Sequence, residues 1–459
     1  MRLAANPGFI EGEPSEGSPS PSRAGSGLRR ELGLVPLAAI VFFNVSGGPY
    51  GVEDAVSSFG PGLALLLLVL TPFLWSLPVS LAMAELAAAM PDEGGYVTWV
   101  RRAFGPFWAF QVGWWSWLDS FVDVAVYPAL FVEYLKFWYP AMAARERWLL
   151  AVLFIVVLTG LNVIGVRPTG RAAVVLSVFA LLPIALVVVF GLAAATQVPW
   201  RPFAAEGRTV GASLGLGLAV VMWNYSGWDT PSTCLGETKA PEHAFRRALF
   251  LALPVIAVAY VLPVGALLAT GATDWSKWDT GALPKLAAAA GGDWLGHAVA
   301  VGAVVSATGL FLTLLLTNSR LPYVLARDGL LPARLAVIHP RFGTPWVAVV
   351  LSAALYSAFA VFSFKELIVL NVWLYSLSLL IELAAFVWLR VREPTLARPW
   401  RVPGGMAAAL VVAVVPAALA LLAMATAGWL NTLAGVVAAL TGPVAYAWAR
   451  AAARPGSPR

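Results

Sequence analysis

The chain alternates long apolar stretches with short polar ones. A helix of roughly 20 apolar residues crosses a bilayer core about 30 Å thick, and stretches of that kind recur along the whole sequence. Pro, Gly and charged residues mark the boundaries between them. The pattern predicts twelve transmembrane helices, near residues 31–59, 62–89, 104–135, 147–165, 171–196, 211–237, 247–271, 294–325, 346–363, 366–391, 406–427 and 429–450.

Composition indicates that lipid surrounds most of this chain. Hydrophobic residues make up 60% of it and charged residues 12%, whereas soluble proteins carry about 25% charged residues. A single soluble core is excluded, because its surface would need more polar groups. We predict an all-α integral membrane protein whose transporter domain covers residues 31–452.

Both ends of the chain differ from this domain. Residues 11–27 (EGEPSEGSPSPSRAGSG) have almost no apolar side chain, so they cannot bury enough surface to become ordered. We expect a disordered tail over residues 1–30, and no signal peptide, because no basic start precedes an apolar core with a cleavage site. Residues 453–459 are expected to form a second, short tail.

Lys and Arg are distributed unevenly between the two sides that alternating helices would define. If the first tail is cytoplasmic, only eight of the 30 Lys and Arg residues lie outside. Positive residues accumulate on the cytoplasmic side, so the bias predicts cytoplasmic termini in the inner (plasma) membrane. The eight outside residues are Lys136, Arg145, Arg147, Arg201, Arg208, Lys277, Lys285 and Lys365.

Catalytic chemistry has little support. The three histidines, His243, His297 and His339, lack the spacing of a metal site. No G-x-x-x-x-G-K-[ST] loop is present to bind a nucleotide. The net charge is +6, but the charged residues lie between apolar runs, so this charge does not indicate nucleic-acid binding. We therefore expect no enzyme, no cofactor and no metal, and transport energy from an ion or substrate gradient.

An internal repeat links the first and sixth apolar runs. The motif N-x-S-G occurs at residues 44–47 and again at residues 224–227. Five helices separate the two copies, so the second half would run in the opposite direction. Apolar segments interrupted by Gly and Pro at matching places in two halves point to a transporter binding site, although two ordinary kinks would look the same.

Each copy of the motif is expected to break its helix. Gly47 and Gly48 have weak helix propensity, and Pro49 is a favoured first helical residue, so helix one should unwind and resume at Pro49. Residues 229–231 (Asp-Thr-Pro) should cap and start the second half of helix six. Each second half would then present free N–H groups to an anion such as a carboxylate.

Acidic residues lie inside the predicted membrane helices. Asp119 and Asp123 are one turn apart on one face, which Tyr127 extends, and Glu382 lies within the tenth run. A charge at the bilayer centre costs roughly 2.5–3.5 kcal/mol, so such residues face a cavity, pair with a cation or take up a proton. The alternative is a neutral carboxylic acid that hydrogen-bonds between packed helices. Trp228, beside the second break, could contact a substrate amine by cation–π attraction or simply pack.

Five blocks resemble one known family. They are VSGGPYGVEDAV (45–56), PDEGGYVTWVRRAFGPFWAFQVGWW (91–115), WNYSGWDTPSTCLGETKAPEHAFRRAL (223–249), LARDGLLPARLAVIHPRFGTP (325–345) and NVWLYSLSLLIELAAFVWLR (371–390). Over about residues 31–405 the chain resembles the amino acid–polyamine–organocation superfamily, and within it the plant-type polyamine uptake and L-type amino acid transporter branch. The resemblance implies a five-plus-five inverted repeat with substrate held at broken helices one and six.

The resemblance also implies individual site residues. Those that match the unwound segments or the acids of the branch are Ser46, Gly47, Gly48, Asp123, Tyr225, Ser226, Gly227, Trp228, Asp229 and Glu382. Asp119, Asp123, Ser306 and Thr308 are candidates for coupling to an ion.

Two departures weaken particular assignments. The branch has an acid in helix three where Val112 stands here, which weakens the polyamine assignment. Some amino acid carriers have a lysine in helix five whose ammonium group takes the place of a sodium ion. Ala180 stands at the matching position here, so that mechanism is not supported.

These observations predict a secondary transporter for amino acids or polyamines, coupled to protons or, alternatively, to sodium. Two further hypotheses remain open: a strict polyamine importer, and a sensor that binds an amine without moving it. The sequence leaves the exact substrate and the oligomeric state undetermined.

Overall fold

The computed structural model describes residues 28–205, 218, 220–360 and 364–452. These residues form an all-α protein without a β-strand, apart from one isolated parallel bridge between Leu32 and Thr238. Within them, eight helices are long and apolar enough to cross a membrane. The expected tails lie largely outside the described residues, as does the first part of the run at 211–237.

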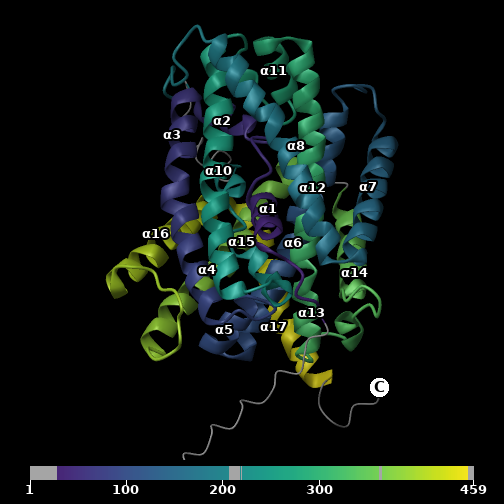
Figure 1. The fold of residues 1–459 in the computed structure, drawn as a ribbon, viewed down its shortest axis with the longest axis vertical. Coiled ribbons are helices and arrows are strands. Elements are labelled where there is room, and N and C mark those ends of the chain that lie inside the picture. Colours follow the sequence, from purple (N-terminus) through teal and green to yellow (C-terminus); the bar gives the residue numbers. More distant parts are fainter. Residues whose placement is uncertain (1–27, 206–217, 219, 361–363, 453–459) are drawn as a thin grey trace, which may run out of the picture.

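The helices follow one another with short connections (Figure 1). They are α1 Leu34–Val45, α2 Glu53–Phe59, α3 Pro61–Thr71, the π-helix η1 Pro72–Ser76, α4 Leu77–Ala89, α5 Tyr96–Phe104, α6 Pro106–Leu135, α7 Ala144–Ile164, α8 Val166–Ala193, the 3-10 helix η2 Thr230–Glu237, α10 Pro241–Thr270, η3 Trp275–Lys277, α11 Leu283–Gly291, α12 Asp293–Asn318, α13 Arg320–Arg327, η4 Ala333–Ala336, α14 Trp346–Phe359, α15 Phe364–Arg392, α16 Gly405–Thr426 and α17 Trp429–Ala452.

Most boundaries lie within a few residues of the predicted runs. Apolar length predicts them well, because the bilayer thickness sets how long each helix must be. Two short helices were not predicted: α5 and α11, which lie at opposite ends of the bundle (Figure 1). Each has too few residues to cross a bilayer, so a search for long apolar runs passes over it.

The first predicted break is present, but its far boundary differs from the prediction. Helix α1 ends at Val45, and helical structure resumes at Glu53, so the expected restart at Pro49 was wrong. Gly47 and Gly51 both have positive φ values, which an α-helix cannot accommodate. The Gly51 N–H donates to the Glu53 carboxylate at 2.8 Å, a bond that joins the end of the break to the first residue of α2.

The second break also interrupts a helix. Helical structure reaches Asn224, is absent from residues 225–229, and resumes as the 3-10 helix η2 at Thr230. Asp229 occupies the N-cap position, but its side chain makes no capping hydrogen bond. The expected carboxylate cap is therefore absent, and the Asp229 side chain is directed elsewhere.

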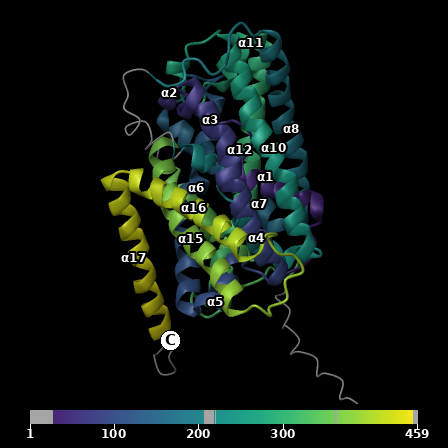
Figure 2. The same ribbon diagram turned by 90° about the vertical axis from the view of Figure 1, so that its left-hand side faces the viewer.

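Helix α1 lies at the centre of the bundle, where it contacts α8, α10 and α12 (Figure 1). In contrast, α16 and α17 lie on one outer side, where they pack against α15 (Figure 2). Peripheral helices expose apolar side chains outwards, for example Val156 on α7 and Val178 on α8. Lipid is the solvent that tolerates such a surface, so the architecture is that of a multi-pass membrane protein.

Candidate functional site

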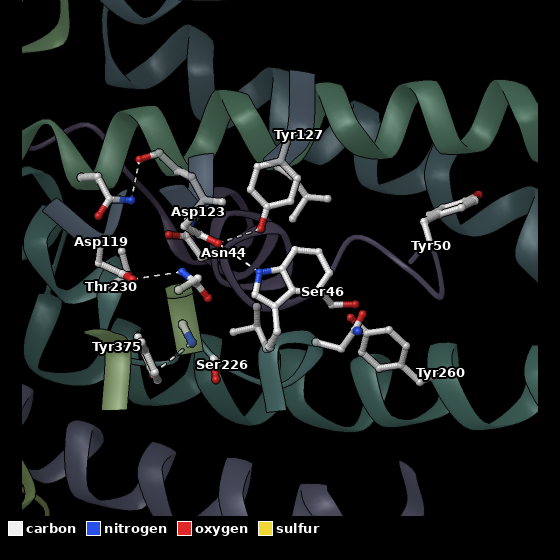
Figure 3. Close-up of a pocket in the computed structure, with 18 residues that line it drawn as sticks. Asn44, Ser46, Tyr50, Asp119, Asp123, Tyr127, Ser226, Thr230, Tyr260 and Tyr375 are labelled. Carbon is white, nitrogen blue, oxygen red and sulfur yellow. Dashed lines mark hydrogen bonds between the residues drawn. The ribbon is translucent and has the colours of Figure 1, made fainter. Parts of the chain in front are cut away.

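A cavity lies between the two helix breaks (Figure 3). Five parts of the chain converge on it: the break after α1, the middle of α6, the break before η2, the C-terminal half of α12 and the first half of α15. Tyr260 of α10 completes the wall. The lining residues are Asn44, Val45, Ser46, Tyr50, Asp119, Asp123, Tyr127, Trp223, Asn224, Ser226, Gly227, Thr230, Tyr260, Leu310, Leu314, Asn318, Asn371 and Tyr375.

Two carboxylates from α6 face this cavity. Asp119 accepts a hydrogen bond from Asn371 Nδ2 at 3.1 Å. Asp123 accepts from Trp223 Nε1 at 3.1 Å and from the Tyr127 hydroxyl at 3.5 Å. No Lys, Arg or His lines the cavity as far as the structure describes the chain. Neutral donors hold both carboxylates without cancelling their charge, so the cavity favours a cationic guest.

Tyr375 connects a third acid to the cavity wall. Its hydroxyl donates to Asp229 Oδ1 at 2.5 Å and accepts the Gly227 N–H at 3.0 Å. Asp229 itself lies behind the lining, 3% exposed. Tyr375 and Asn371 were not among the predicted site residues, although their spacing of one helical turn in the tenth run places them on one face.

Side chains and backbone of neighbouring elements hold the first break open. Ser46 lines the cavity, and its Oγ accepts the Gly48 N–H at 3.0 Å. Ser306 of α12 donates to the Gly47 carbonyl at 2.8 Å. Gly47 and Gly48 lie outside the lining, so they shape the break rather than contact the cavity. Thr308, the other hydroxyl candidate on α12, donates to the Val304 carbonyl of its own helix at 2.7 Å.

Only part of the second break reaches the cavity. Ser226 and Gly227 line it. The Tyr225 hydroxyl donates instead to the Leu68 carbonyl at 2.9 Å, and Trp228 Nε1 donates to the Tyr225 carbonyl at 2.7 Å. Both of these rings are fully buried and outside the lining, which places them as supports of the break.

Glu382 lies away from the cavity lining, two turns further along α15 than Tyr375. It is 1% exposed, and neither of its carboxyl oxygens has a hydrogen-bond partner among the described residues. An ionised carboxylate without a donor is very unfavourable in such a place. The geometry therefore favours the protonated form of Glu382.

Comparisons with known proteins agree on one family. The family model for amino acid permeases matches residues 32–449. Polyamine transporter PUT1 of Oryza sativa subsp. japonica is 38% identical over 428 residues, which are 92% of this chain and 77% of that protein. Polyamine transporter RMV1 of Arabidopsis thaliana is 35% identical over 415 residues, 90% of this chain and 83% of that protein.

A bacterial relative extends the same likeness. Branched-chain amino acid permease BcaP of Bacillus subtilis is 27% identical over 450 residues, 91% of this chain and 92% of that protein. The family match includes both helix breaks and every residue that lines the cavity. The chain therefore belongs to the amino acid permease family and is a membrane permease.

Proposed function

We propose that this permease imports cationic amines, with polyamines as its principal substrates, and couples their import to protons. One observation carries the proposal: Asp119 and Asp123 line a cavity to which the described residues contribute no basic side chain. In a membrane interior, a charged substrate binds where opposite charge compensates its lost hydration. Two carboxylates one turn apart suit a substrate that carries more than one ammonium group.

The backbone of the breaks favours a polyamine over an amino acid. An amino acid carboxylate would need free N–H groups at the breaks. Three of these groups already donate to side-chain oxygens: Gly48 to Ser46, Gly51 to Glu53 and Gly227 to Tyr375. The two relatives named as polyamine transporters point the same way, whereas the bacterial amino acid permease supports amino acids as the alternative.

Uptake into proteoliposomes tests the substrate. Purified protein should accumulate labelled spermidine or putrescine when the outside is acidic, and unlabelled polyamine should compete better than unlabelled arginine or leucine. Preference for arginine or leucine would contradict the polyamine assignment. Counterflow separates a carrier from a sensor, because only a carrier exchanges internal unlabelled substrate for external labelled substrate.

We assign the twelve-helix, five-plus-five inverted repeat to this chain on the strength of its two breaks. Both asparagines of the shared motif make the same local bond: Asn44 Nδ2 donates to the Ile40 carbonyl at 2.9 Å, and Asn224 Nδ2 to the Val220 carbonyl at 2.8 Å. Equivalent residues with equivalent bonds in oppositely directed helices are what an inverted repeat predicts.

Cysteine labelling tests the proposed orientation, in which both termini are cytoplasmic. In a Cys234→Ala background, Lys277→Cys should react with an impermeant thiol reagent added to intact cells, whereas Arg334→Cys should react only after the membrane is opened. Both side chains are exposed in the structure, so protein burial does not explain a difference. The reverse labelling pattern would overturn the orientation and the charge argument behind it.

Glu382 is the best candidate for the coupling proton. It is buried without a hydrogen-bond partner among the described residues, and it lies near Asp229, whose carboxylate contacts the cavity residue Tyr375. A change in the charge of Asp229 would therefore affect both the protonation of Glu382 and the position of Tyr375 in the cavity wall. Sodium stays the alternative coupling ion, since Ser306 and Thr308 donate only their hydrogens, to the Gly47 and Val304 carbonyls, and keep oxygen lone pairs that can bind a cation.

Gly47→Ala should abolish transport while the protein still inserts in the membrane. Gly47 has a φ of +111°, and a Cβ there would lie 2.6 Å from both Leu310 Cδ1 and Ser306 Oγ. The added methyl group must displace the Leu310 and Ser306 side chains of α12, and the positive φ strains any residue that has a Cβ. Uptake in proteoliposomes and size-exclusion chromatography measure the two effects.

Gly105→Ala is a matched control for this substitution. Gly105 also has a positive φ, of +84°, but a Cβ there would meet nothing within 4 Å. Backbone strain alone should reduce its stability by about 1–3 kcal/mol and leave the uptake by the folded protein largely intact. Equal uptake by the two variants would mean that contact between the break and α12 is unimportant for transport.

A further inference from the structure

A second group of buried charges lies at the end of the bundle that holds α5 and α13, here called the α13 end (Figure 1). Arg320 Nε donates to Glu237 Oε2 at 2.8 Å, and Arg320 Nη2 donates to Glu237 Oε1 at 3.0 Å. Both side chains are at most 1% exposed. This ion pair joins α13 to the end of η2, the segment that follows the second helix break.

The same residue of η2 also holds the chain that leads into α1. The Glu237 carbonyl accepts the N–H groups of Glu31, at 2.9 Å, and Leu32, at 3.0 Å. Glu237 therefore ties together three elements: the entrance to helix one, the second half of helix six, and α13. Contacts of this kind must separate if the two broken helices are to move and open the cavity at the α13 end.

Glu93 lies against this ion pair without joining it. It is in the connection between α4 and α5, is 4% exposed, and has no hydrogen-bond partner for either carboxyl oxygen among the described residues. It fits only because position 236 is glycine, where a Cβ would lie 2.2 Å from Glu93 Oε2. The proposed transport cycle assigns no role to the Glu93 carboxyl group.

Charge balance indicates which acid holds a proton. Arg320 is the only fully buried cation described in this group, and the bidentate bond assigns it to an ionised Glu237. An ionised Glu93 would be a second buried anion with no side-chain donor among the described residues, and a neutral Glu93 avoids this cost. The remaining titratable or charged neighbours are Cys234 on η2 and Tyr323 and Arg327 on α13.

The electrostatic surroundings agree with this assignment. Burial raises the pKa of Glu93 well above its usual range, and the charge of Glu237 raises it further. Arg320, Arg327 and the neighbouring backbone N–H of Gly236 lower the pKa without cancelling the rise. When the α13 end opens, water would hydrate Glu93 and lower its pKa, so the closed form binds a proton that the open form releases.

We infer that Glu93 is a proton-binding site that locks the α13 end: the protonated carboxyl group permits closure around the Glu237–Arg320 pair, and its ionisation favours opening. Because the closed form holds the extra proton, a rise in pH shifts the equilibrium towards the open form. The inference needs only the permease fold. It would survive failure of the polyamine assignment, and its own failure would leave that assignment untouched.

Cys234 provides a native reporter of this opening. It is the only cysteine in the sequence, its side chain is 0% exposed, and it lies on η2 among the residues that interact with Glu93. The test measures the rate at which N-ethylmaleimide alkylates Cys234 in the purified, full-length protein at about pH 6 and about pH 8. The same measurement on the unfolded chain gives the effect of pH on the alkylation of a fully exposed Cys234.

In the wild-type protein, the ratio of the two rates should exceed that of the unfolded chain by at least about tenfold, since the two pH units between the measurements change the ionised-to-protonated ratio of an acid about hundredfold. Glu93→Gln imitates the protonated acid, so its ratio should equal that of the unfolded chain, with slow alkylation at both pH values. Glu93→Ala also removes the titrating carboxyl group, so its ratio of alkylation rates should likewise equal that of the unfolded chain.

Glu393→Gln is the matched control. Glu393 is a partly exposed acid at the same end, where it pairs with Arg102, and its replacement should leave the wild-type ratio unchanged. An excess ratio that persists in both Glu93 variants would assign the pH dependence to another group and overturn the inference. A wild-type ratio equal to that of the unfolded chain would overturn it as well.

Discussion

Replacement of Asp123 by Asn should reduce uptake of a cationic substrate at least about tenfold, since a loss of about 1.4 kcal/mol of attraction is sufficient for that change. Asn retains the size of Asp and an oxygen that can accept from Trp223 Nε1, now 3.1 Å from the carboxylate. Packing of α6 should therefore survive, while the charge that faces the cavity is lost. Initial rates of spermidine uptake into proteoliposomes measure the effect.

Asp274→Asn is the control for this substitution. Asp274 lies in an exposed connection, where its carboxylate accepts from Ser276, and it is remote from the cavity. Its replacement should leave uptake at the wild-type rate. If Asp123→Asn lowers only the yield or the thermal stability, and the remaining protein transports normally, Asp123 is a packing residue and the substrate lies elsewhere.

The driving gradient distinguishes two roles for Asp123. If Asp123 binds the substrate amine, any transported neutral amino acid should still accumulate in response to a pH gradient. If it carries the proton, accumulation should disappear for every substrate while exchange continues. The hydrogen bonds from Trp223 and Tyr127 stabilise the ionised form of Asp123, which favours the first result.

Replacement of Glu382 by Gln should abolish accumulation against a gradient while exchange of substrate across the membrane continues. Glutamine has nearly the same size but cannot release a proton. Glu382 makes no hydrogen bond to another described residue, so the exchange breaks no observed bond. Two measurements on the same proteoliposomes decide the matter: accumulation driven by an imposed pH gradient, and counterflow without one.

Glu133→Gln serves as the matched control for Glu382→Gln. Glu133 lies near the end of α6, where it pairs with Lys136 at 2.8 Å and is partly exposed. Both accumulation and counterflow should remain at wild-type levels in that variant. If Glu382→Gln loses counterflow as well, Glu382 is needed for binding or for movement of the helices, and proton coupling must be assigned to another residue.

Much of the architecture could be predicted from the sequence, for a physical reason. Bilayer thickness sets a minimum apolar length, so the positions of most helices follow from where apolar residues are continuous. Gly47 and Gly48 weaken the helix wherever it is placed, so the first break was also predictable. Its far edge was not, because the non-helical backbone continues through Gly51, whose φ is positive, and α2 begins only at Glu53.

The acids of α6 were predictable for a similar reason. Asp119 and Asp123 are one turn apart in an apolar helix, and their charge demands a partner or a proton whatever surrounds them. Glu382 satisfied the same rule, but its place outside the cavity lining could not be foreseen. The direction in which a helix presents a given side chain depends on how its neighbours rotate it, and that is a property of packing.

Only the tertiary structure decided which residues meet. Asn371 and Tyr375 approach Asp119 and Gly227 from a helix distant in sequence, and Tyr225 and Trp228 turn away from the cavity that their neighbours line. Glu93 lies beside Arg320 because the α4–α5 connection, η2 and α13 pack together at one end of the bundle. Apolar length and helix-breaking residues act locally and can be read along the chain, whereas these encounters depend on the summed packing of every helix.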